Sequence, residues 1–327
     1  MILAGDIGGT KTNLAYFSIK DGTLESHTLA SYPSQQHGSL RDIVVRFIAD
    51  NPAPVTASAF GIAGPVMNGR SEATNLPWIV DASELATALN LKHVSLLNDL
   101  SATAYGILRL SEKDKFMLNP GKAELHAPIA IIAAGTGLGE GGLVWNGTEY
   151  RTLASEGGHT DFAPRNELEM DLLRFLLKRY DRVSYERIIS GPGLYNIYEF
   201  LRTRATSPEP QWLKDQIASG DPSAAVSRAA TEQKDMVCAD ALEIFISLYG
   251  AEAGNLALKL LSTGGVYVAG GIAPKIITQI QQGSFMKSFA QKGRFTNLLK
   301  NMPVSIVLDD KAALLGAAHY ALMEQKV

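Results

Sequence analysis

Carboxylates beside glycine clusters are the residues of this sequence best suited to chemistry. Asp6 lies within Gly5-Asp6-Ile7-Gly8-Gly9-Thr10-Lys11, and Asp99 follows Asn98 at the end of an apolar run. Glycines let the main chain approach a phosphate closely, and Asp6 could hold Mg²⁺ directly or through water. Asp99 could accept the proton of an attacking hydroxyl, the part that Asp plays in protein kinases, and its reference pKa of about 3.9 leaves it ionised at neutral pH. An Asx turn or a helix N-cap is the alternative for Asn98-Asp99.

The first glycine cluster resembles a P-loop but departs from it. A P-loop has glycine before its lysine, where this chain has Thr10, and it opens a helix. Asn13–Ile19 instead alternates like a strand. We therefore predict a hairpin turn with amides that face phosphate. From this segment alone, a tight turn with an exposed Asp and Lys is an equal alternative.

Two further glycine clusters follow strand-like runs. Gly135-Thr136-Gly137-Leu138-Gly139-Glu140-Gly141-Gly142 matches G-x-G-x-x-G formally, but Leu143-Val144-Trp145 and a hairpin turn follow it, so a dinucleotide site is rejected. A second phosphate-facing hairpin remains, which with the first could clamp a polyphosphate. Gly270-Gly271 ends a strand before a helix and suits a flat adenine ring, although a plain turn there is a serious alternative.

Three more polar residues suit the hydroxyl groups of a sugar. Glu156-Gly157-Gly158-His159 joins a carboxylate and an imidazole, and Glu186 precedes a glycine-rich turn. A structural histidine and a solvated glutamate are the alternatives. A metal site here is disfavoured because no H-E-x-x-H or Cys/His cluster accompanies the segment.

The elements that position these residues form two similar series of strands followed by helices. The second series contains a large helical insertion, and the alternation favours two α/β halves facing a cleft. In the first series we predict strands at Ile2–Ile7, Asn13–Ile19, Thr23–Tyr32, Val55–Ile62 and His93–Leu97, and helices from Leu40, from Asp81 to Leu89 and over Ser101–Leu108. In the second we predict strands at Ile129–Ala134, Val266–Ala269 and Val304–Leu308, and one or two strands over Leu143–Leu153. The helices predicted there are Glu167–Tyr180, Gly193–Arg204, Ala224–Leu261, Pro274–Gln281 and Asp310–Met323.

Length and composition exclude several classes of protein. The 327 residues predict two domains, and a hydrophobic content of 46% excludes a mainly disordered chain. The net charge of −3 gives no footprint for nucleic acid, and the single cysteine, Cys238, is predicted to be buried on a helix. No run approaches the roughly 20 apolar residues of a membrane span, and no signal peptide is apparent, so a cytoplasmic protein is expected.

The order of six motifs resembles the bacterial glucokinase family of the zinc-free type, within the actin-like ATPase superfamily of hexokinase and Hsp70. The motifs are GDIGGTKTN, LLNDLSATAYG, GTGLGEGG, EGGH, YERIISGPG and VAGGIAPK. The resemblance spans essentially the whole chain. It implies two actin-like (ribonuclease H-like) α/β domains flanking a cleft, the second enlarged by helical insertions. The domains would comprise residues 1–109 with a C-terminal helix 310–327, and residues 110–309.

The resemblance also implies a site for MgATP and glucose. It implies that Gly5–Lys11 and Gly135–Gly139 are phosphate loops and that Gly270 and Gly271 lie by adenosine. It implies a glucose site of Asn75, Asn98, Asp99, Glu156, His159 and Glu186, with Asp99 as the base, and a homodimer. Asn13 stands where some relatives carry arginine. No cysteine follows the EGGH segment, which argues against zinc and against the related repressor/sugar-kinase group.

Three alternatives to a glucokinase remain open. The chain could be a kinase for fructose, mannose or an N-acetylhexosamine. It could be a sugar-sensing regulator, which as a dead enzyme would lack Asp99 or the loop glycines. An Hsp70- or actin-like ATPase would lack the clustered sugar-type residues.

Overall fold

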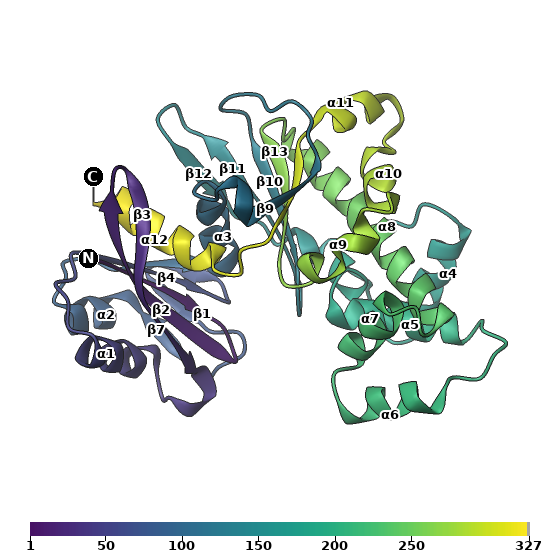
Figure 1. The fold of residues 1–327 in the computed structure, drawn as a ribbon, viewed down its shortest axis with the longest axis horizontal. Coiled ribbons are helices and arrows are strands. Elements are labelled where there is room, and N and C mark those ends of the chain that lie inside the picture. Colours follow the sequence, from purple (N-terminus) through teal and green to yellow (C-terminus); the bar gives the residue numbers. More distant parts are fainter. Residues whose placement is uncertain (326–327) are drawn as a thin grey trace. The chain divides into compact units, whose positions relative to one another are not determined.

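The computed structural model describes residues 1–325, which divide into two compact units (Figure 1). Unit 1 comprises Met1–Asp114 together with the chain from Asp309 onward, and unit 2 comprises Lys115–Leu308. The sequence predicted a terminal helix reaching residue 327, but residues 326 and 327 lie outside the described residues. Within residues 1–325, no helix is both long enough and apolar enough to cross a membrane.

Unit 1 contains a five-stranded mixed sheet that begins with the predicted meander. β1 is antiparallel to β2, β2 is antiparallel to β3, and β4 and β8 run parallel to β1. The order is β3-β2-β1-β4-β8, with bounds β1 (Ile2–Ile7), β2 (Lys11–Lys20), β3 (Thr23–Pro33), β4 (Ala57–Ile62) and β8 (Ser95–Asn98). β2 starts at Lys11 rather than at the predicted Asn13, because Lys11 already pairs with Pro33 across the sheet.

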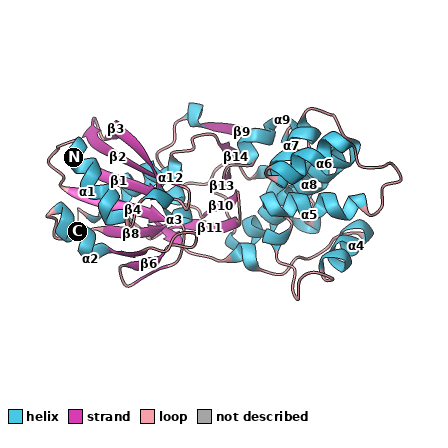
Figure 2. Cartoon of the chain, turned by 90° about the horizontal axis from the view of Figure 1, so that it is seen from below, coloured by secondary structure: helices cyan, strands magenta, loops and turns pink. Residues whose placement is uncertain are grey.

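Helices cover both faces of this sheet (Figure 2). Leu3 and Leu14 share one apolar cluster with α1 and α2, whereas Ile2 and Ala4 share another with α12. The bounds are α1 (Leu40–Asp50), α2 (Ala82–Leu89), α3 (Asp99–Ile107) and α12 (Ala312–Glu324). A small antiparallel sheet, absent from the prediction, is formed by β5 (Val66–Met67), β6 (Arg70–Glu72) and β7 (Ile79–Asp81).

The helix that follows β8 begins two residues earlier in the sequence than predicted. We predicted a helix from Ser101, but α3 begins at Asp99 because the Asn98 side chain accepts a hydrogen bond from the Leu100 amide and caps the helix. The strand is also shorter at its start, since His93 and Val94 precede β8.

Unit 2 repeats the strand order and directions of unit 1 and adds one antiparallel edge strand. The order is β12-β11-β10-β13-β14-β9, with bounds β9 (Lys115–Asn119), β10 (Ile129–Ala134), β11 (Leu138–Trp145), β12 (Tyr150–Leu153), β13 (Gly265–Ala269) and β14 (Val304–Val307). β11 is antiparallel to β10, and β13 and β14 run parallel to β10. The predicted duplication and α/β class are therefore confirmed.

The second glycine turn is shorter than predicted. β11 begins at Leu138 instead of Leu143, because Leu138–Leu143 pairs residue by residue with β10. Main-chain hydrogen bonds hold this part of the strand, so its glycines give no apolar alternation for a sequence pattern to detect. Only Gly135-Thr136-Gly137 forms the turn.

The helical part of unit 2 contains a break that the sequence prediction missed. The single helix predicted over Ala224–Leu261 is wrong: α7 ends at Thr231, Gln233 takes a positive φ of 54°, and Asp235 caps α8 by accepting from the Cys238 amide. Cys238 is buried, as predicted. The predicted helix Pro274–Gln281 is a 3₁₀ turn followed by one short helix. The bounds are α4 (Glu167–Leu176), α5 (Gly191–Arg202), α6 (Gln211–Ser219), α7 (Pro222–Thr231), α8 (Met236–Leu260), α9 (Ile277–Ile280), α10 (Ser284–Ala290) and α11 (Thr296–Asn301).

Candidate active site

The glycine turn of unit 1 joins β1 to β2 and presents unpaired amides. The Gly8 amide donates to the Lys11 carbonyl at 3.0 Å, and the Ser34 hydroxyl donates to the Gly8 carbonyl at 2.8 Å. Within residues 1–325, the N–H groups of Gly9 and Thr10 have no hydrogen-bond acceptor. A turn that is fixed at both ends and leaves two amides unpaired is suited to an anion such as phosphate.

Asp6 lies on β1 directly before this turn, opposite Asn13 on β2. Burial raises the pKa of Asp6 to about 6. A hydrogen bond from Asn13 and the charge of Lys11 oppose that rise, while the charges of Asp99 and Asp310 add to it. A partly desolvated carboxylate in a negative field favours a bound cation, and carboxylate oxygen is a ligand that Mg²⁺ accepts.

No cage made of protein side chains surrounds Asp6. Across the described chain, no group of three or more His, Cys, Asp or Glu residues is placed to hold a metal ion. Mg²⁺ typically keeps several waters and binds through one or two carboxylates plus substrate phosphates. The residues present fit a magnesium ion of that kind, with Asp6 as the ligand.

Asn98 and Asp99 lie at the junction of β8 and α3. The Asn98 amide is used locally, since its Oδ1 accepts from the Leu100 amide and its Nδ2 donates to the Gly64 carbonyl at 3.1 Å. Asp99 is half-buried in the first turn of α3. A Cβ on Gly61 of β4 would lie 3.9 Å from the Asp99 Cα and 3.8 Å from the Gly5 carbonyl oxygen. The end of β1 and Asp99 are therefore neighbours across a position that has no side chain.

Asn75 belongs to the same part of unit 1. It is exposed in the loop between β6 and β7, and a Cβ on Gly9 would come within 2.5 Å of the Asn75 Cβ. The structure thus brings together the first glycine turn, Asp6, Asp99 and Asn75, which the sequence placed in one site.

The glycine turn of unit 2 is built in a similar way. The Gly135 amide donates to the Gly137 carbonyl at 2.9 Å, and the Gly191 amide at the start of α5 donates to the Gly135 carbonyl at 2.8 Å. In the part of the chain that is described, the amides of Thr136 and Gly137 have no acceptor. This turn too offers two amides to an anion.

A cavity of about 640 Å³ opens beside the second turn. It joins Gly135 and Thr136 to Gly271, three residues that the sequence assigned to ATP. The other lining residues come from α5, α7 and the turn after β13: Gly191, Pro192, Leu194, Asp221, Ser223, Ala224, Ser227, Arg228, Thr231, Ile272 and Lys275. A cavity of this volume with hydroxyls and two cations is suited to a nucleoside and its phosphates.

Two predicted nucleotide residues do not line this cavity. Gly139 pairs with Ala133 inside the β10–β11 ladder. Gly270 has a φ of +83°, and a Cβ there would collide with the main chain of Ala134, so its role is to form the turn after β13. Direct contact of either residue with ATP stays a prediction.

Sequence reasoning missed the contribution of α7 to the cavity. Asp221 with Pro222 is a recognisable helix start, since Asp caps helices and Pro favours the first helical position. Nothing in that pattern indicates that Ser223, Ser227 and Arg228 face the second glycine turn. Ser223 and Ser227 lie four residues apart and so share one face of the helix, but that spacing does not say which segment the face contacts.

Glu186 and His159 lie together in unit 2, close to the second turn. One oxygen of Glu186 accepts from the Leu138 amide at 3.0 Å, and the other lies 3.9 Å from Nδ1 of His159. Glu156 is exposed, and its carbonyl accepts from the His159 amide at 3.0 Å. The Tyr185 amide donates to the Thr160 carbonyl, so the segments Glu156–Thr160 and Tyr185–Arg187 run side by side. Together they offer carboxylate and imidazole groups to a polar ligand.

Three comparisons with known proteins, by family model, by sequence and by fold, all match this chain to glucokinases. The model of the glucokinase family matches residues 3–324. A glucokinase from Trichormus variabilis is 45% identical over 335 residues, covering 97% of this chain and 98% of its own. The crystal structure of a glucokinase from an Antarctic psychrotroph is 29% identical, with a TM-score of 0.87 and 98% of each chain covered.

A more distant structure shares the actin-like ATPase fold. It is a ROK family glucokinase from Streptomyces griseus in complex with glucose and AMPPNP, 23% identical, with a TM-score of 0.64, 98% of this chain and 99% of that chain covered. Because the family model spans nearly the whole chain and the sequence relatives align over almost their full lengths, this chain belongs to the glucokinase family of sugar kinases.

Proposed function

We propose that the protein transfers the γ-phosphoryl group of ATP to the 6-hydroxyl of glucose in a single in-line step. The observation that carries this proposal is the cavity of unit 2, where the second glycine turn meets Gly271, Arg228 and Lys275. Its relatives are named glucokinases, and the Streptomyces griseus structure holds glucose together with AMPPNP. Those names and that complex are the support for the choice of substrates.

In unit 1, the proposal gives two carboxylates separate tasks. Asp99 orients the attacking hydroxyl and takes its proton, whereas Asp6 holds Mg²⁺. The magnesium ion, when bound, neutralises charge on the phosphates. The unpaired amides of Gly9 and Thr10, with Lys11 beside them, stabilise phosphate oxygens. Phosphoryl transfer requires mainly positioning and charge stabilisation, which these groups supply.

In unit 2, the second glycine turn holds phosphate and the cavity holds the nucleoside. Glu156, His159 and Glu186 bind sugar hydroxyls, joined in the proposal by Asn75 and Asn98 from unit 1. Because Glu186 accepts from the Leu138 amide next to the turn, its orientation is linked to that of the phosphate loop. The proposal requires both units to act on one pair of substrates, and a structure with glucose and AMPPNP bound tests that requirement.

A coupled assay with glucose and MgATP tests the reaction directly. Formation of a sugar 6-phosphate that depends on both substrates supports the proposal. The same assay with fructose, mannose and N-acetylhexosamines decides the sugar, since a kinase for another hexose gives its highest kcat/KM with that hexose. Absence of turnover with every sugar, together with ATP-dependent filament formation, would contradict the proposal.

The resemblance to the family also implies a homodimer, and we retain it as part of the proposal. Size-exclusion chromatography with light scattering measures the mass in solution. A mass equal to that of one chain over the concentrations used in the assay would remove the dimer without affecting the proposed reaction.

A further inference from the structure

A carboxylic acid is buried without a hydrogen-bond partner in the second sheet. Glu140 lies on β11 with 1% of its surface exposed, and neither of its side-chain oxygens has a hydrogen-bond partner within residues 1–325. Other buried glutamates differ: Glu169 accepts from Arg165, and Glu252 accepts from Asn255 and Lys259. Burial without donors penalises an ionised carboxylate strongly, so this environment favours the neutral acid.

Glu140 packs directly beneath the segment to which we assign sugar binding. A Cβ on Gly157 would collide with Oε2 of Glu140 and would lie 3.1 Å from its Cβ and Cδ. The carboxyl group therefore touches the main chain of Gly157 with no side chain between them. Gly157 starts the short 3₁₀ helix Gly157–His159, which follows Glu156. The Glu140 side chain therefore packs against the main chain at the start of this segment.

The helix α8 places further charges around this carboxyl group. Glu252 is fully buried, and Lys259 donates to it at 3.2 Å. Desolvation first, and then the charge of Glu252, raise the pKa of Glu140 to about 7, while Lys259 opposes the rise. Tyr249, also on α8, is a further titratable group beside Glu140, and Glu156 and His159 belong to the segment that packs on it. Ionisation of Glu140 therefore falls in the neutral range and places a second negative charge beside Glu252.

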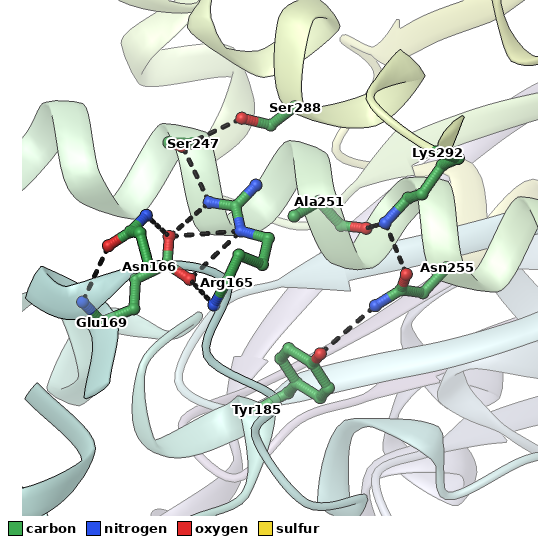
Figure 3. A network of polar contacts seen from close by, with 9 residues as sticks. All are labelled: Arg165, Asn166, Glu169, Tyr185, Ser247, Ala251, Asn255, Ser288 and Lys292. Carbon is green, nitrogen blue, oxygen red and sulfur yellow. Dashed lines mark hydrogen bonds and ion pairs between the residues drawn. The ribbon is translucent and has the colours of Figure 1, made fainter. Parts of the chain in front are cut away.

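Asn255, also on α8, contacts both Glu252 and the segment that carries Glu186. Figure 3 shows its contacts with Tyr185 and Lys292. The Asn255 amide donates to Glu252 at 2.7 Å and to the Tyr185 hydroxyl at 3.2 Å, and Lys292 donates to Asn255 at 2.5 Å. Tyr185 opens the 3₁₀ helix Tyr185–Arg187, which carries Glu186. Partnered groups thus hold the Glu186 segment, whereas an unpartnered acid holds the Gly157 segment.

We infer that Glu140 is a positioning residue for sugar binding: its neutral form holds Gly157 and the segment Glu156–His159 in place, and its ionisation releases them. The inference rests on the proposed function, because it assumes that this segment binds the sugar. Among residues 1–325, no group donates a hydrogen bond to the oxygens of Glu140, so its ionisation requires that water enter or the segment move. Sugar affinity falls as a result, while the nucleotide cavity and Asp99 are unaffected.

The test compares wild type with Glu140→Gln, which keeps the shape and stays neutral. We measure kcat and the KM values for glucose and ATP between about pH 6 and pH 9, a range that brackets an acid of pKa near 7. In wild type the KM for glucose should rise roughly fivefold or more with pH relative to Glu140→Gln, whose KM for glucose should lack that rise. The KM for ATP should follow the same profile in both proteins.

Two further variants sharpen the comparison. Glu140→Ala removes the contact with Gly157, so its KM for glucose should be raised about tenfold at every pH with a smaller change in kcat. Glu243→Gln is the matched control, because Glu243 is an exposed carboxylate on the same helix as Glu252, roughly 13 Å earlier along the axis. It should behave as wild type.

A second readout does not depend on turnover. Hydrogen–deuterium exchange of a peptide covering 155–162, corrected for intrinsic rates, should accelerate above pH 7 in wild type and not in Glu140→Gln. An identical pH profile for the glucose KM in wild type and Glu140→Gln, with unchanged exchange, overturns the inference. A wild type that phosphorylates no glucose instead overturns the proposed function, and the exchange experiment then still decides whether Glu140 controls the segment. If Glu140→Ala fails to fold, the Glu140→Gln comparison remains decisive.

Discussion

The two sheets share one strand order, but one equivalent buried position in their second strands is apolar in unit 1 and acidic in unit 2. Leu14 on β2 pairs with Gly5, two residues before the end of β1, and Glu140 on β11 pairs with Ile132, two residues before the end of β10. Both side chains are buried, but Leu14 belongs to an apolar cluster and Glu140 is an unpartnered acid. The fold thus fixes where a buried side chain will be, while the residue placed there decides whether that position responds to pH.

The two glycine turns differ in a complementary way. The turn of unit 1 carries charge, with Asp6 before it and Lys11 after it, whereas the turn of unit 2 carries none and opens onto a cavity. In the proposed function, unit 1 supplies the metal and proton chemistry and unit 2 binds the nucleoside. Each prediction below tests one side of this division.

The largest effect is expected for Asp99→Asn in unit 1. Loss of a general base lowers kcat by roughly 10²- to 10⁴-fold, while the KM for glucose changes little because the amide keeps the shape. Steady-state kinetics measure both constants. Asp21→Asn is the control, since Asp21 lies in a hairpin turn with a φ of 50°, which asparagine also adopts. A kcat for Asp99→Asn within threefold of wild type would falsify the base assignment.

The next largest effect is expected when the buried acid Glu140 is replaced by leucine, the residue that unit 1 has at the equivalent position, Leu14. Because burial raises the pKa of Glu140 from 4.5 to about 7, its contribution to stability is complete below about pH 4.5 and is lost as the pH rises to 7. That loss amounts to roughly 3 kcal/mol in the free energy of unfolding. Glu140→Leu should lack this loss.

Urea denaturation of wild type and Glu140→Leu from about pH 5 to pH 8 measures the difference. Asp6, whose pKa is raised to about 6, contributes a similar decline between about pH 4 and pH 6 in both proteins and so cancels in the comparison. Parallel curves for the two proteins across this range would contradict the raised pKa of Glu140.

A smaller effect is expected on filling the cavity of unit 2. A Cβ on Gly271 would meet no atom within 4 Å, so Gly271→Leu can fold normally while its side chain occupies nucleotide space. The KM for ATP should rise about tenfold or more, which corresponds to roughly 1.4 kcal/mol of binding energy, with little change in the KM for glucose. Equal increases in both KM values would argue against nucleotide binding in this cavity.

The smallest effect is expected for Ser34, whose hydroxyl helps to hold the glycine turn of unit 1. Ser34 is buried, and its hydroxyl bonds to the Gly8 carbonyl and to the Thr12 hydroxyl. Ser34→Ala should cost about 1–2 kcal/mol of stability and raise the KM for ATP roughly two- to threefold, because the turn loses one of its ties. Thermal unfolding and kinetics measure the two changes. Ser39→Ala is a matched control, as it removes a helix cap on the same connection without touching the turn.

The sequence was informative where side-chain periodicity or capping chemistry carried the signal. An apolar run that ends in glycines predicted β1, alternation predicted most of β2, and the Asp21-Gly22 turn predicted the start of β3. The glycines in the first half of β11 hid this part of the strand from prediction. Main-chain hydrogen bonds to β10 form it, so it needs no alternating apolar side chains. The break before α8 was concealed because Glu232–Asp235 contains neither Gly nor Pro, although Asp235 is a usable N-cap signal.

For the site, the sequence predicted local motifs better than the residues from distant segments that lie beside them in the fold. The glycine turns and Asp6 could be found because a local pattern carries their chemistry. The cavity residues on α7 could not, since about 90 residues separate Thr136 from Arg228 along the chain and only the folded chain brings them together. Glu140 was hidden for a different reason: within a glycine cluster, its burial becomes visible only when Gly157 is packed over it.

The position of α12 has a consequence for the order in which the nascent chain becomes structured. β1 and β2 are synthesised before the whole of unit 2, yet the cluster of Ile2, Ala4, Ala15 and Phe17 is covered by α12, which follows unit 2 in the sequence. Unit 2 is continuous in sequence and lacks this delay. A ribosome-bound chain that ends at Leu308 would thus leave this cluster without its covering helix, so unit 1 cannot be completed until α12 has been synthesised.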